Sequence, residues 1–286
     1  MPDMNIYESV MKITTSLFIL VTFLGLFVDA YAIKPDREYF MTPDSVGWNY
    51  EELKIKTSDE VMLNAWIYEA NPTRSNDTVI ILAYPDAGNM SYFVYYSAIV
   101  ANAGYTVVTF DYRGFGKSDD FEIQQDYLYY TEFAKDLEAV VKTVSSKFPE
   151  KKIGIWGMSM GTTIASRAYP ALKGKVDFLI GEGYVTDTLA IIDRYKALDK
   201  SLTLPEKHTE YKKAIRAIDI PLLIFTASND TITTHEDALA LKTILGYSCE
   251  VIPYSGDHLT GFQNQLDSKG FGGWYVEQIN QFLENI

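Results

Sequence analysis

Short apolar runs and longer segments with helical spacing alternate along most of this chain. A run that is apolar throughout is typical of a central parallel strand covered on both faces. The runs expected to form such strands are 78–84 and 221–227, and further strands are expected at 105–110, 153–156, 178–180 and 249–253. Because helical segments separate them, the pattern predicts a mostly parallel, twisted sheet with helices on both faces.

The segments between the strands carry helix signals. Helices are expected at 91–103, 127–148, 161–169, 234–245 and 274–283. Apolar residues recur on one face of 127–148 until Pro149 ends the pattern, and Thr234 is suited to the N-cap of its helix. The segment 183–218 is more polar and is interrupted by Pro205, so we expect a small helical cap there.

Two further strands are predicted before the first buried run. Residues 51–57 alternate between apolar and charged positions, and 61–68 is mainly apolar, with Ser58-Asp59-Glu60 as a short turn between them. This hairpin brings the expected sheet to about eight strands. The preceding stretch, 33–50, holds Pro35, Pro43 and Gly47 and is expected to wrap around the domain.

The first 32 residues have a different character. An apolar run at 13–28 follows Lys12 and precedes Ala30-Tyr31-Ala32, a small-x-small pattern typical of signal-peptidase sites. We therefore expect 1–32 to be a secretory signal, with a membrane anchor as the alternative, and 33–286 to be the folded domain. Both readings predict an exported protein, periplasmic or extracellular, and the second adds membrane association through 13–28.

Charge and cysteine content exclude some classes of function. The 286 residues have a net charge of −13 and show no lysine-arginine cluster, which disfavours nucleic-acid binding. The single cysteine, Cys249, permits neither an intramolecular disulfide nor a cysteine-cluster metal site. We expect it to act as a small apolar residue in a strand.

Candidate chemistry centres on Gly157-Met158-Ser159-Met160-Gly161, between an expected strand and an expected helix. A turn this sharp forces the middle residue into strained backbone angles and leaves little room for side chains at the two flanking positions, which favours glycine. It also places the serine hydroxyl at a helix N-terminus, where backbone N–H groups can stabilise an anion.

A serine nucleophile needs a base, and the base needs a carboxylate that orients it. Of the histidines at 208, 235 and 258, His258 alone follows the last expected strand in a glycine-containing loop. Asp230 lies at the C-terminal end of the 221–227 strand and is the favoured acid. Glu182, after the 178–180 strand, and Asp257, beside the histidine, remain alternatives.

Together these features resemble an α/β-hydrolase of the serine-hydrolase kind, over about residues 50–286. The resemblance rests on the Gly-x-Ser-x-Gly motif, on the order Ser159, Asp230, His258, and on the loop Asp111-Tyr112-Arg113-Gly114-Phe115-Gly116-Lys117-Ser118. That loop is similar to the family's D-x-R-G-x-G-x-S turn, which is structural. The chain is most similar to small esterases, monoacylglycerol lipases, depalmitoylases and serine-aminopeptidase-like proteins.

The resemblance implies a role for each site residue. Ser159 attacks the acyl carbon, His258 transfers the proton, and Asp230 fixes the imidazole tautomer. The backbone N–H groups of Met160 and Asp86 are the implied oxyanion-hole donors.

The second donor lies in a loop that departs from the family's pattern. Members usually carry His-Gly-x there, often as H-G-N-A-G-N, whereas this chain has Tyr84-Pro85-Asp86-Ala87-Gly88-Asn89. Proline stiffens a turn that glycine normally allows, and a carboxylate beside an oxyanion is unfavourable unless it points away.

We therefore expect a serine hydrolase that cleaves a carboxylic ester or thioester, with a small acyl-ester or acyl-thioester substrate and without a metal or organic cofactor. A serine peptidase and a non-catalytic binding protein of the same fold are the alternatives. The many tyrosines permit an aromatic pocket, although most tyrosines of this kind cover helix faces. The tyrosines that could form such a pocket are Tyr92, Tyr95, Tyr96, Tyr127, Tyr129 and Tyr130.

Overall fold

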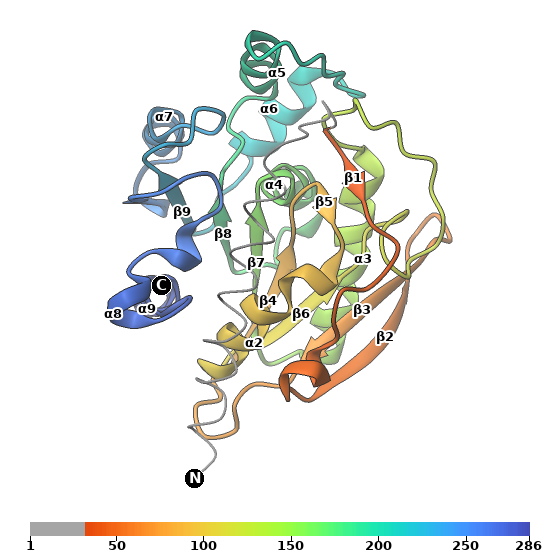
Figure 1. The fold of residues 1–286 in the computed structure, drawn as a ribbon, viewed down its shortest axis with the longest axis vertical. Helices are drawn as coiled ribbons and strands as arrows, with labels where there is room; N and C mark the ends of the chain where they lie inside the picture. The colour runs from red at the N-terminus through yellow and green to blue at the C-terminus, as the bar shows by residue number, and fades with distance from the viewer. Residues whose placement is uncertain (1–31) are drawn as a thin grey trace. The chain divides into compact units, whose positions relative to one another are not determined.

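The computed structural model describes residues 32–286 of the chain. These residues form an eight-stranded sheet in the order β10-β9-β8-β7-β4-β6-β3-β2 (Figure 1). The strands are β2 (Tyr50–Lys56), β3 (Met62–Tyr68), β4 (Thr78–Ala83), β6 (Thr106–Phe110), β7 (Lys152–Met158), β8 (Phe178–Glu182), β9 (Leu222–Ala227) and β10 (Cys249–Tyr254). β3 is antiparallel to β2 and to β6, and the other neighbours pair parallel. The prediction of a mostly parallel sheet of about eight strands is confirmed.

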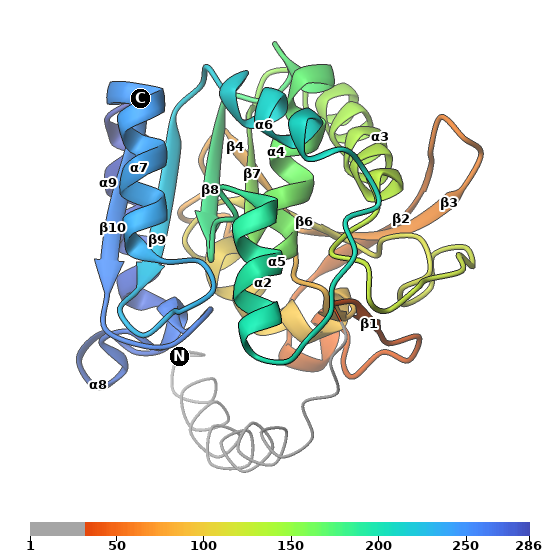
Figure 2. The same cartoon turned by 90° about the horizontal axis from the view of Figure 1, so that it is seen from above.

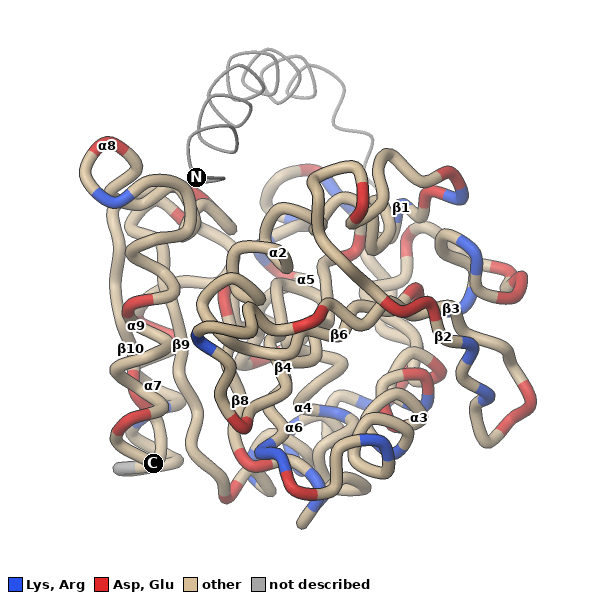
Figure 3. Tube along the Cα trace, turned by 90° about the horizontal axis from the view of Figure 1, so that it is seen from below, with Lys and Arg blue, Asp and Glu red and all other residues tan. Residues whose placement is uncertain are grey.

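Helices cover both faces of this sheet, as predicted (Figures 2 and 3). α2 (Val94–Asn102) and α9 (Gly273–Glu284) lie on one face. The other face carries α3 (Thr131–Lys147), α4 (Met160–Leu172) and α7 (His235–Leu245). Four inner strands, β4, β6, β8 and β9, are buried along their whole length, which explains their mainly apolar sequences. Cys249 is buried at the start of β10, as expected.

The segment after Ala32 runs along the carboxyl ends of the strands. β1 (Lys34–Pro35) pairs in parallel with β5 (Ala87–Gly88), a two-stranded contact that the sequence pattern did not predict. The Asn89 side chain adds hydrogen bonds to the carbonyls of Asp36 (3.1 Å) and Glu38 (2.7 Å). These contacts fix the loop that follows β4.

The loop at 111–118 is structural, in keeping with the resemblance. The buried carboxylate of Asp111 accepts hydrogen bonds from the backbone N–H groups of Met90 (3.0 Å) and Lys117 (3.0 Å). A Cβ on Gly116, whose φ is +45°, would lie 2.0 Å from Asp111 Oδ2, so this position requires glycine.

Two helices occupy the segment expected to form the cap, between β8 and β9: α5 (Thr188–Ala197) and α6 (His208–Arg216). The carboxylate of Glu206, between them, binds Arg167 of α4 at 2.8 Å and also accepts the hydroxyl of the buried Tyr129. The cap segment is therefore tied to the helix that follows the candidate nucleophile.

The predicted signal or anchor, including the apolar run 13–28, lies outside the described residues except for Ala32. In the part of the chain from 32 to 286, no helix is both long and apolar enough to span a membrane.

Candidate active site

Ser159 occupies the sharp turn between β7 and α4, with φ 48° and ψ −114°. The residues two positions before and after it, Gly157 and Gly161, have no room for side chains. A Cβ on Gly161 would lie 1.8 Å from the carbonyl oxygen of Ala83, and one on Gly157 would lie 2.9 Å from the backbone of Thr162. The strained serine and the two glycines are what the sequence motif predicted.

The structure brings Ser159, His258 and Asp230 into one line of hydrogen bonds. The Ser159 hydroxyl lies 3.1 Å from Nε2 of His258, and Nδ1 of the same ring lies 2.6 Å from Oδ2 of Asp230. Both distances allow the imidazole to accept a proton from the serine while the carboxylate holds the opposite N–H. Three loops that are far apart in the sequence supply these groups.

Asp230 is held by the turn that follows it. Its Oδ1 accepts the backbone N–H groups of Ile232 and Thr233, each at 2.9 Å, and its Oδ2 accepts the Thr233 hydroxyl. Burial alone would raise the pKa of Asp230, but the hydrogen bond and charge of His258 and the Thr233 donors hold it at about 2. The carboxylate is therefore ionised and correctly aimed at neutral pH. No pattern in the sequence marks Thr233 as a site residue.

The contact between Asp230 and His258 shifts the pKa of the histidine upward. Burial would lower the pKa of His258, but the hydrogen bond and charge of Asp230 raise it above the ordinary value of 6.5. Asp86 and Glu182 contribute in the same sense. The site thus stabilises the imidazolium that would form when the ring takes a proton.

Glu182 and Asp257, the alternative acids, have other partners. Glu182 is 1% exposed, and its Oε1 accepts the Tyr254 hydroxyl (2.7 Å) and the Gly261 N–H (2.8 Å). Its backbone carbonyl accepts the Ser159 N–H at 2.8 Å. Asp257 is exposed and accepts the Asn229 side-chain amide at 3.1 Å. Glu182 therefore supports the loops that carry the serine and the histidine.

The other two histidines are bound to threonines elsewhere. Nδ1 of His208 lies 2.9 Å from the Thr188 hydroxyl in the cap segment, and Nδ1 of His235 lies 2.8 Å from the Thr226 hydroxyl. His235 is the first residue of α7, in the helix predicted at 234–245.

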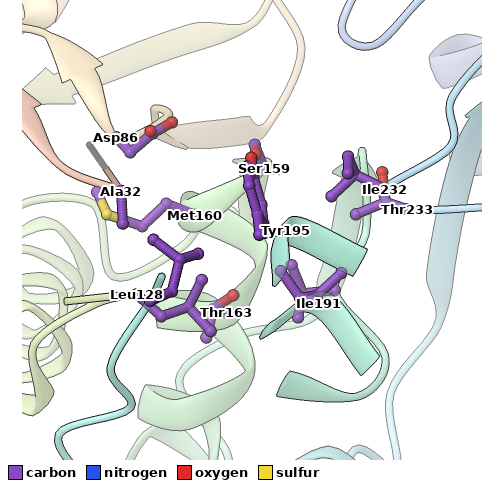
Figure 4. A pocket seen from close by; sticks show the side chains of 12 residues that line it. Ala32, Asp86, Leu128, Ser159, Met160, Thr163, Ile191, Tyr195, Ile232 and Thr233 are labelled. Carbon is purple, nitrogen blue, oxygen red and sulfur yellow. The ribbon is translucent and has the colours of Figure 1, made fainter. Parts of the chain in front are cut away.

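The candidate oxyanion residues lie at one cavity with the serine (Figure 4). Met160 is the first residue of α4, and Asp86 follows β4 in the loop fixed by β1. The cavity is small, about 30 Å³. Its lining residues are Ala32, Asp86, Leu128, Ser159, Met160, Thr163, Val185, Ile191, Tyr195, Leu202, Ile232 and Thr233.

The six tyrosines considered from the sequence do not line this cavity, so the hypothesis of an aromatic pocket built from them is wrong. Tyr96 packs instead against Phe262 and Phe271. Tyr195 of α5 is the aromatic residue in the lining. Within residues 32–286, no group of three or more His, Cys, Asp or Glu side chains is arranged to hold a metal ion.

The chain is similar to a family model and to several curated proteins. A family model described as serine aminopeptidase, S33, matches residues 88–186. The chain is 30% identical to the uncharacterized protein YfhR of Escherichia coli O157:H7 over 285 residues, which cover 96% of this chain and 95% of that protein. It is 26% identical to the lysophosphatidylserine lipase ABHD12 of Danio rerio over 210 residues, 64% of this chain and 53% of that protein. The chain spans about half the length of several curated relatives it matches.

Among solved structures, the esterase Pf2001 of Pyrococcus furiosus is similar to this chain, with a TM-score of 0.68. The two are 21% identical, and the superposition covers 88% of this chain and 99% of the esterase. At that level of identity the likeness shows a shared fold.

Proposed function

Because this chain belongs to the α/β-hydrolase superfamily of serine hydrolases, we propose that it cleaves carboxylic esters or thioesters through an acyl-serine intermediate. The observation that supports this most directly is the continuous hydrogen-bonded line from Ser159 through His258 to Asp230, with distances of 3.1 and 2.6 Å. The fold places that line at the carboxyl ends of the strands, where ligands of open α/β sheets bind.

In the proposed reaction, Ser159 attacks the acyl carbon while Nε2 of His258 takes the hydroxyl proton. Asp230 keeps the other ring N–H directed toward itself and stabilises the imidazolium. The imidazolium then protonates the leaving alcohol or thiol as the bond to it breaks, which leaves the acyl group on Ser159. A water molecule, activated by the neutral His258, attacks this ester and releases the acid.

The backbone supplies the proposed stabilisation of the tetrahedral oxyanion. The N–H of Met160 is at the first turn of α4, where helix N–H groups lack partners within the helix and the dipole favours negative charge. The N–H of Asp86 is the proposed second donor. Loss of one such donor typically lowers kcat about 10²- to 10³-fold.

The cavity favours short acyl groups. With Ala32 in its wall, the cavity measures about 30 Å³, several times less than the roughly 150 Å³ cavity that accepts a benzene ring in an engineered protein. Cleavage before Ile33 would remove Ala32 and open this side of the cavity, so the inference about acyl length applies to the protein that retains Ala32. Apolar side chains such as Leu128, Ile191 and Leu202 form much of its wall. An acetyl, propionyl or similarly small acyl group fits this space best.

Export and membrane association through 13–28 remain part of the proposal. One relative is named as a lysophosphatidylserine lipase, which makes acyl esters of lipids a further class to include among test substrates. A protein sequenced from its native host with an N-terminus at Ile33 would support the cleaved signal, and one that retains 13–28 would support the anchor.

The first test is labelling of the purified protein with a fluorophosphonate probe, which reacts with activated serines. We expect labelling of the wild type and of His235→Ala, a control histidine bound to Thr226, and none of Ser159→Ala or His258→Ala. Hydrolysis of p-nitrophenyl esters of increasing chain length should then decline beyond short acyl chains. Labelling that persists in Ser159→Ala would contradict the assignment of the nucleophile.

A further inference from the structure

Asp86 places a carboxylate in the wall of the cavity that contains Ser159 (Figure 4). Among the side chains and backbone N–H groups that the structure describes, no other group donates a hydrogen bond to it, and it forms no ion pair with a described lysine or arginine. Burial raises the pKa of Asp86, and its own backbone N–H and the charge of His258 lower it. A partly buried carboxylate without a partner is unusual, because an uncompensated charge is costly to remove from water.

The rest of the cavity wall is mostly apolar. Leu128, Met160 and Ile191 line the same small cavity. Tyr195 adds an aromatic ring, and the pKa of its hydroxyl is raised to about 12, first by burial and then by the charges of Asp86 and Asp230. Asp86 and Tyr195 therefore belong to the wall of the same cavity. A carboxylate together with an aromatic ring is a combination that binds ammonium groups.

The carboxylate is also unfavourable for hydrolysis of a neutral substrate. It lies close to the oxyanion that would form and carries the same sign of charge. It also interacts with its own backbone N–H, which is the group proposed to donate to that oxyanion. A positive group on the substrate would pair with the carboxylate, cancel the repulsion and release the N–H for the oxyanion.

We propose that the cavity selects short acyl groups that carry an ammonium group, of the size of a glycyl or alanyl ester, and that Asp86 binds this ammonium. The inference rests on the proposed serine-hydrolase function and adds to it the substrate class. The small volume favours a short acyl group, and the unpaired carboxylate favours a positive charge on it.

The test compares two substrates of equal shape, the benzyl esters of alanine and of isobutyric acid, in which an ammonium replaces a methyl group. At pH 7 an α-amino group, with a pKa of about 7.7–8.0, is mostly protonated. For the wild type we expect kcat/KM to be at least about tenfold higher for the alanyl ester. Asp86→Asn keeps the shape and the backbone N–H but removes the charge, so it should lower kcat/KM for the alanyl ester and raise it for the isobutyryl ester.

Asp257→Asn is the matched control, because it removes an exposed carboxylate next to His258 and should leave the ratio of the two kcat/KM values unchanged. A wild-type ratio of one or less, or a ratio that Asp86→Asn does not change, would overturn the inference. Cleavage of neither ester by a protein whose Ser159 still reacts with the fluorophosphonate would overturn it as well and leave the hydrolase proposal standing. Loss of that reaction in the wild type would instead contradict the proposed function itself.

Discussion

Gly183 offers a direct test of how tightly the imidazole of His258 is positioned. This glycine follows β8 with φ +62°, and a Cβ added to it would lie 2.6 Å from Cε1 of His258. Ordinary contacts begin near 3.4 Å, so alanine at this position must push the ring by about 0.8 Å. The ring cannot turn away freely, because one nitrogen binds Asp230 at 2.6 Å and the other faces Ser159 at 3.1 Å.

The expected loss of activity follows from that displacement. A shift of about 1 Å in a reacting group can lower the rate roughly 10²-fold. We therefore expect Gly183→Ala to reduce kcat about 10²-fold, with a smaller change in KM, because the acyl cavity is lined by other residues. The left-handed backbone adds a stability cost of about 1–2 kcal/mol for a residue with a Cβ, equivalent to a few degrees in the melting temperature.

Gly174→Ala is the control that separates the two effects. Gly174 has φ +75°, and no described heavy atom lies within 4 Å of the position of its Cβ. The backbone strain is therefore similar, and the contact with His258 is absent. Both variants should melt a few degrees below the wild type, but only Gly183→Ala should lose ester hydrolysis and fluorophosphonate labelling. Wild-type kcat in Gly183→Ala, or equal losses in the two variants, would refute the reasoning.

Three further predictions concern the charges and the turn around the triad. A protonated imidazole cannot act as the base, and Asp230 raises the pKa of His258, so kcat/KM should fall at acid pH with a midpoint above pH 6.5. Asp230→Asn should lower that midpoint and reduce kcat about 10²- to 10⁴-fold. Glu182→Gln, which removes a second negative charge that raises the pKa of His258, should shift the acid limb of the same profile to lower pH with a loss of kcat of only a few-fold; an unchanged limb would contradict this. Gly161→Ala, which would place a Cβ 1.8 Å from the Ala83 carbonyl oxygen, should lower the unfolding free energy in urea by about 1–3 kcal/mol or more and abolish labelling.

The sheet and the nucleophile turn were predictable because local sequence determines them. A strand covered on both faces is mainly apolar, and β4, β6 and β9 show this, with threonine as their only polar residue type. The glycines at 157 and 161 are required by backbone contacts within a few residues of the turn or with the adjacent strand. Such requirements leave a signature in one short stretch of sequence, even though the contact of Gly161 is with Ala83 in a strand far away in the sequence.

The choice between Asp230 and Glu182 could not be settled in the same way, because both follow a predicted strand. In the structure, backbone hydrogen bonds between the ends of β9 and β10 favour Asp230. The Ser228 N–H donates to the Tyr254 carbonyl and the Asn229 N–H to the Gly256 carbonyl, each at 2.9 Å, which brings the next residue, Asp230, to the histidine loop. Glu182 is turned into the core beneath that loop instead. These contacts join residues almost thirty positions apart and leave no local pattern.

The departure at Tyr84-Pro85-Asp86 has a similar explanation. Tyr84 is fully buried and packs against Phe93 and Tyr112, with ring centroids 5.6 and 4.8 Å away. Pro85 is buried too, and the Asp86 carbonyl accepts the Lys34 N–H at 2.8 Å, so the unusual sequence builds a well-packed loop. Of the three residues, Asp86 is the one that lines the cavity. The departure from the family's pattern is therefore compatible with a well-packed loop. Under the proposal above, it changes the charge that a substrate meets, which is why substrate charge is the property to vary first.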